Sequence, residues 1–103
     1  MPVEVTSHVR TDDDGIAWID ETRIKVIEVA LDHIAYGWSA EEIHRQHPNL
    51  SLAQCHSALA YYYDNQAQFD KAIAESYARA DKMARQDDRS PVRLKLRALG
   101  ILP

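Results

Sequence analysis

The most constraining feature of the sequence is a pair of helix starts separated by a proline. In the first, Ser39 is followed three residues later by Glu42. In the second, Ser51 is followed by Gln54 at the same spacing. Such a pair forms a capping box, in which each side chain satisfies a free backbone amide at the start of a helix. Pro48 lies between them and ends the first helix, because proline cannot continue a helix. The sequence therefore predicts two helices joined by a short turn, as in a helix-turn-helix.

The second of these helices, predicted over residues 52–63, has two contrasting faces. One face is apolar and is expected to point into the core; it consists of Leu52, Cys55, Leu59, Tyr62 and Tyr63, with His56 on its flank. The other is expected to point outward; it consists of Ala53, Gln54, Ser57, Ala60, Tyr61 and Asp64. Neither face carries a lysine or arginine, which matters for any interpretation as a DNA-reading helix.

The N-terminal part of the chain is predicted to contain a flexible arm, a β-hairpin and a helix. The arm spans residues 1–15. Strands are expected over residues 16–19 and 22–26, joined by Asp20-Glu21, because apolar residues there recur at every second position. The spacing then changes to that of a helix, which Gly37 ends as a residue suited to the left-handed conformation. This helix and the following two would form a three-helix core.

A long fourth helix is predicted over about residues 66–85. At 1.5 Å per residue it would be about 30 Å long, more than the three preceding helices can easily cover. We therefore expect its apolar stripe to form a homodimer, the commonest oligomer. The alternative is that this helix folds back over its own three helices. The stripe contains Phe69, Ile73, Tyr77 and Met83.

The remaining segment, residues 87–103, is a basic amphipathic tail attached to the hairpin and helix domain of residues 16–86. Beyond Asp88 its charges are all positive. Pro91 and Gly100 suit the two ends of a short helix, but alternation of apolar and basic residues suits an added strand equally. We expect the tail to bind an acidic protein, with packing against its own chain or capping of a dimer as alternatives. The expected partner-binding residues are Arg89, Arg93, Leu94, Lys95, Leu96 and Arg97.

Composition excludes several classes of protein. A chain of 103 residues is expected to form one domain, and a formal net charge of −4 offers no overall attraction to a polyanion. No apolar run approaches the roughly 20 residues of a membrane helix, so a cytoplasmic protein without membrane contact is expected.

The sequence has no phosphate loop or nucleophile motif, which predicts a non-enzymatic protein. His44, His47, Cys55 and His56 do not follow a known zinc spacing, so no metal or cofactor is expected.

The sequence resembles a bacterial family, domain of unknown function 433, over about residues 15–75. The resemblance rests on Thr22-Arg23-Ile24, on Gly37 followed by Ser39-Ala40-Glu41-Glu42-Ile43, on Pro48 with Leu50-Ser51-Leu52, and on Ala58-Leu59-Ala60-Tyr61-Tyr62. It implies a small dimeric helix-turn-helix domain behind a β-hairpin, acting as a VapB-like antitoxin of a PIN-type ribonuclease toxin. In such antitoxins the globular part binds promoter DNA and a C-terminal extension wraps the toxin.

Two functional hypotheses follow for a mainly α fold of this kind. In the first, the chain is an antitoxin that binds toxin through its tail and DNA through Arg45, Gln54, Ser57 and Tyr61. Gln can pair with adenine and Ser can contact bases or phosphates. In the second, the same fold is an adaptor or scaffold that binds protein and not DNA. The charge of the surface around Gln54 and Ser57 discriminates between them, because DNA affinity comes mostly from neutralised phosphates. Cations gathered there with Arg45 favour the first hypothesis, and an acidic surface favours the second.

Overall fold

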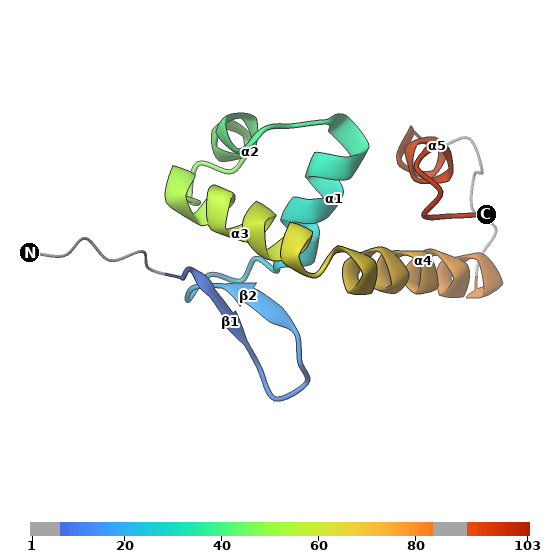
Figure 1. The fold of residues 1–103 in the computed structure, drawn as a ribbon, viewed down its shortest axis with the longest axis horizontal. Coiled ribbons are helices and arrows are strands. Elements are labelled where there is room, and N and C mark those ends of the chain that lie inside the picture. Colours follow the sequence, from blue (N-terminus) through green and yellow to red (C-terminus); the bar gives the residue numbers. More distant parts are fainter. Residues whose placement is uncertain (1–6, 84–90) are drawn as a thin grey trace, which may run out of the picture.

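The part of the chain that the structure describes folds into two short strands followed by five helices (Figure 1). The computed structural model describes residues 7–83 and 91–103. The predicted fold class, mainly helical with a short N-terminal β-hairpin, is confirmed. In chain order the elements are β1 (Val9–Thr11), β2 (Ala17–Ile19), α1 (Val26–Tyr36), α2 (Ala40–Gln46), α3 (Leu52–Asp64), α4 (Gln66–Met83) and α5 (Pro91–Ala98).

The hairpin pairs different strands from those predicted. β2 pairs antiparallel with β1, in the register Val9 to Ile19, so its partner lies within the expected flexible arm. Residues 22–26 contribute only an isolated bridge between Lys25 and Trp18. The hydroxyl of Thr22 donates to the carbonyl of Ile19 (2.7 Å) within a tight turn directly after β2. Because α1 begins at Val26, few residues remain after this turn to form a full strand.

Asp12 organises the loop between β1 and β2. Its carboxylate accepts hydrogen bonds from the backbone amides of Asp14 (2.9 Å) and Ile16 (3.0 Å). It also accepts one from the indole nitrogen of Trp18 (2.8 Å). The bond from Trp18 is the main cause that lowers the pKa of Asp12 from its ordinary value. The sequence suggested no more than an acidic turn here, because three consecutive aspartates do not reveal which one is bonded.

Acid is expected to destabilise the hairpin through Asp12. A carboxyl whose pKa is lower in the folded state stabilises the fold above its unfolded pKa, and this contribution is lost as the pH falls through the folded value. We therefore expect hairpin stability to fall below about pH 4. The indole proton resonance of Trp18, followed by NMR from pH 7 to pH 2, reports the change. Asp12→Asn should lower stability already at neutral pH and flatten the acid response.

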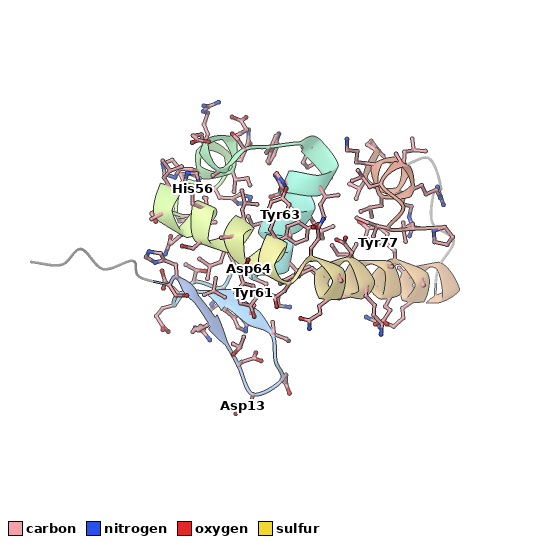
Figure 2. All side chains as sticks on the ribbon, viewed as in Figure 1. Asp13, His56, Tyr61, Tyr63, Asp64 and Tyr77 are labelled. Carbon is pink, nitrogen blue, oxygen red and sulfur yellow. The ribbon has the colours of Figure 1, made fainter. Side chains whose placement is uncertain are left out.

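The matched control is Asp13→Asn in the same loop. Asp13 is exposed and lies at the hairpin tip (Figure 2), so its replacement should leave both the Trp18 resonance and the acid response unchanged. An equal effect of the two substitutions would contradict the role assigned to Asp12.

Helix ends follow the predicted capping signals closely. Ser51 and Gln54 form the complete capping box of α3, with bonds of 2.8 and 3.0 Å. Ser39 accepts from the amide of Glu42 (3.3 Å), although the Glu42 carboxylate turns to its own helix instead of back to Ser39. Gly37 follows α1 with a φ of 68°, which a residue with a side chain adopts only at a cost. These local signals place the helix-turn-helix as expected.

The core lies where α1, α2 and α3 meet, and β2 contributes Ala17 and Ile19 to it. α3 packs against both α1 and α2, and α1 also contacts β2. The largest fully buried side chains here are those of Ile19, Val26, Val29, Ile43, Leu50, Cys55 and Tyr62. The hydroxyl of buried Tyr62 has a hydrogen-bond partner, because it donates to the Asp70 carboxylate (2.8 Å). Burial, followed by this bond, raises the pKa of Tyr62.

The predicted tail is a helix that packs on the rest of the domain. α5 lies beside α1 and above α4 in Figure 1, and it contacts α1. Leu96 is fully buried and Arg93 is 2% exposed, with its guanidinium 4.8 Å from the ring centre of Tyr77. Leu96 and Arg93 thus lie inside the fold in this arrangement, as the alternative of packing against the chain itself expected, and partner binding by the tail stays a prediction. Of the other residues assigned to partner binding, Leu94 and Lys95 are exposed, Arg97 is half-buried, and Arg89 lies outside the described residues.

The apolar stripe of α4 packs against its own chain at Phe69, Ile73 and Tyr77. Ile73 is 1% exposed, and Phe69 packs against Tyr61 and Tyr62 with ring centres 5.9 and 5.8 Å away. Tyr77 lies under Arg93, and the side chain of Met83 is outside the described part. The spacing of these residues thus gives no argument for a dimer, and the homodimer stays a prediction. No helix within residues 7–83 and 91–103 is long and apolar enough to cross a membrane.

Candidate functional site: the exposed face of helix α3

The solvent face of α3 agrees only in part with the face that the sequence predicted, because Ala53, Ala60 and Asp64 are exposed as expected. Leu52 is 39% exposed and Tyr63 is 54% exposed, although both were expected in the core. With them lie four further exposed residues, Ala53, His56, Ala60 and Asp64. We call these six residues the α3 face; Figure 2 labels His56, Tyr63 and Asp64 along the helix. The difference arises because the hairpin packs on α3 from the side that was expected to be open.

Gln54 is held by the hairpin side of the domain. Its amide oxygen accepts from the amide of Ser51, and its amide nitrogen donates to the carboxylate of Asp20 (2.9 Å). Asp20 also contacts the ring of His8 (2.7 Å). The bond from Gln54, followed by that from His8, lowers the pKa of Asp20. Bidentate pairing of Gln54 with adenine would first have to break both bonds.

The other residues predicted to contact DNA are also engaged or covered. Tyr61 is half-buried and packs edge-on against Phe69 of α4, and Ser57 is half-buried. Arg45 is exposed on α2, but its guanidinium pairs with the Glu42 carboxylate. The structure therefore does not bring Arg45, Gln54, Ser57 and Tyr61 together on one open surface.

The electrostatic character of the α3 face is neutral to acidic. α3 contains no lysine or arginine. Its exposed charge is that of Asp64, and the carboxylate of Glu41 on α2 lies 3.7 Å from the ring of His56. Phosphate groups would meet no cation on this helix.

Aromatic residues extend this face onto the end of α1. The ring of His33 is bonded at both nitrogens, by Nδ1 to the carbonyl of Trp38 (2.7 Å) and by Nε2 to the hydroxyl of Tyr63. Because the Trp38 carbonyl can only accept, Nδ1 carries the proton, and in the neutral ring Nε2 accepts from Tyr63. Tyr36 stacks on Trp38 with ring centres 4.7 Å apart. Tyr36 is 55% exposed, so exposed aromatic side chains lie both on α3 and at the end of α1.

Sequence reasoning missed the exposed aromatic side chains of α3 and of the end of α1. It placed Tyr63 in the core and attached no role to Tyr36 or His33. One signal was present: Gly37 ends α1 and turns the chain, which places Trp38 against the last turn of the helix.

The expected absence of a metal or cofactor stays a prediction. Among residues 7–80 and 91–103, no three His, Cys, Asp or Glu side chains converge as metal ligands would. Cys55 is buried in the core, and burial raises the pKa of its thiol. A thiol of this kind is a poor nucleophile, because the thiolate is the reactive form.

These features define a small helical domain of the helix-turn-helix class, placed behind a β-hairpin. Residues 14–62 match the family described as "Protein of unknown function (DUF433)". The resemblance found in the sequence is therefore confirmed over these residues, which extend from the hairpin loop to Tyr62. The comparison with curated proteins gave no match, nor did the comparison with solved structures.

Proposed function

We propose that this chain is a non-enzymatic protein-binding domain whose α3 face contacts another protein. The observation that carries the proposal is the composition of that face. Exposed Tyr63, Leu52 and His56 lie beside the carboxylates of Asp64 and Glu41, and α3 offers no cation. Aromatic side chains are enriched in protein interfaces, whereas DNA affinity depends on neutralised phosphates.

The resemblance suggests the first partner to test, a PIN-type ribonuclease toxin. A second exposed region supports contact with an acidic protein of this or another kind. Leu94 and Leu99 are 52% and 54% exposed on and after α5, and Lys95 between them is exposed too. An antitoxin role would therefore use the outer side of a packed helix α5, since Arg93 and Leu96 are buried.

Cross-linking and capture from cells that express the tagged full chain would test the proposal. We expect mass spectrometry to recover a protein partner, with a PIN-type ribonuclease as the antitoxin outcome. The double variant His56→Ala with Tyr63→Ala should no longer recover that partner, because it removes the imidazole and the phenol ring of the α3 face. Asp13→Asn, at the distant hairpin tip, is the matched control and should retain it.

DNA recovered in the same experiment decides the alternative. Sequencing is expected to show no enriched fragment, and fluorescence anisotropy should give a Kd for random duplex weaker than about 10⁻⁴ M at physiological salt. Enrichment of one sequence, with an affinity that falls steeply with salt, would contradict the proposal and favour a DNA-binding antitoxin.

A further inference from the structure

An apolar cavity of about 340 Å³ lies between the hairpin loop, the start of α1 and α4. It is separate from the residues of the α3 face. Its apolar wall is formed by Ile16, Ile27, Tyr61 and Phe69. A volume above about 300 Å³ and an apolar lining are typical of sites for small molecules.

Three residues whose side chains can donate hydrogen bonds line the same cavity. They are Lys25, Tyr61 and Gln68. Within the described residues, no carboxylate pairs with Lys25, and Tyr61 and Gln68 make no side-chain hydrogen bond. Glu28 bonds to the backbone amide of Lys25 (2.7 Å) and not to its ammonium, which lies 5.4 Å from the Trp18 ring centre.

We propose that this cavity binds a small carboxylic acid with an apolar body. The carboxylate would lie against the Lys25 ammonium, where charge makes a hydrogen bond stronger. The Tyr61 hydroxyl and the Gln68 amide would donate to it as well. The hydrocarbon part would lie against Ile16, Ile27 and Phe69. This site goes beyond protein binding at the α3 face, and either proposal can fail without the other.

An NMR titration with 4-phenylbutyrate tests the site, with the neutral 4-phenylbutanamide as its matched control ligand. We expect the acid to give saturable shifts of the backbone amides of Ala17, Ile27 and Ala72, and to bind about tenfold more tightly than the amide. This comparison of ligands uses the unaltered protein and does not depend on how a variant folds.

Two variants and a control extend the test. Lys25→Met removes the charge and keeps an unbranched apolar chain, so it should weaken binding of the acid about tenfold and leave the neutral amide unaffected. Ala72→Phe fills the cavity from α4 and should weaken both ligands. The control is Lys71→Met. Lys71 precedes Ala72 in the chain, is exposed and does not line the cavity, so its replacement should leave both affinities unchanged.

The proposal is overturned by any of three results. These are the absence of saturable shifts at the cavity, equal affinity for acid and amide, or equal losses from Lys25→Met and Lys71→Met. Shifts confined to the α3 face would likewise overturn it, and they would leave the protein-binding proposal standing.

Discussion

Leu96→Ala is expected to lower the free energy of unfolding by about 2–5 kcal/mol, as large-to-small changes in a core do. Leu96 belongs to the tail that the sequence treated as a partner-binding segment, yet it is fully buried. Its carbonyl also accepts from the amides of Ile101 (2.9 Å) and Leu102 (3.3 Å), so the chain after α5 folds back over it. Urea denaturation followed by circular dichroism measures the loss.

Leu94→Ala is the matched control on the same helix. Leu94 is 52% exposed, and surface substitutions of this kind usually change stability by no more than about 0.5 kcal/mol. Equal and small effects of the two substitutions would show that α5 is not held against α1 in solution. The tail would then be free to bind a partner, as the sequence analysis expected.

Leu50→Ala is the second substitution with a large expected effect, again a loss of about 2–5 kcal/mol. Leu50 lies in the turn between α2 and α3 and is fully buried. Its backbone is bonded on both sides, because its amide donates to the carbonyl of His47 (2.9 Å) and its carbonyl contacts the ring of His44 (2.6 Å). The site therefore cannot collapse easily around the missing side chain, and thermal unfolding should show a marked drop in Tm.

Leu52→Ala provides the control two residues away. Leu52 is 39% exposed on the α3 face, so its truncation should cost well under 1 kcal/mol. If Leu52→Ala lowers the free energy of unfolding as much as Leu50→Ala does, Leu52 is in the core, as the helical pattern first indicated. Leu52 would then not belong to the α3 face. In the capture experiment, by contrast, Leu52→Ala should weaken partner recovery.

The faces of α3 illustrate where sequence reasoning stops. A pattern of apolar residues predicts that one side of a helix is buried, but α3 is covered on two sides, by the other helices and by the hairpin. Gln54 lies under the hairpin because its amide bonds to Asp20, 34 residues earlier in the chain. No local pattern contains that information, so the predicted outward face included Gln54, Ser57 and Tyr61, which are half-buried.

The hairpin and the tail show the same limit. Residues 17–19 were correctly predicted as a strand, but they pair with residues 9–11, which the sequence assigned to a flexible arm. For α5, the sequence allowed a helix or a strand, and a free or packed state. The packed helix prevails because Leu96 completes a core that α1 and α4 leave open.

The sequence by itself determined the positions of the first four helices and the class of the fold. Ser39, Ser51 and Gly37 act on neighbouring backbone groups, so their effects can be read locally. Only the tertiary structure decided which side of α3 meets solvent, which strand pairs with β2, and that α5 belongs to the core. Those outcomes depend on contacts between residues far apart in the chain, where burial and bonding to a distant partner outweigh local preference.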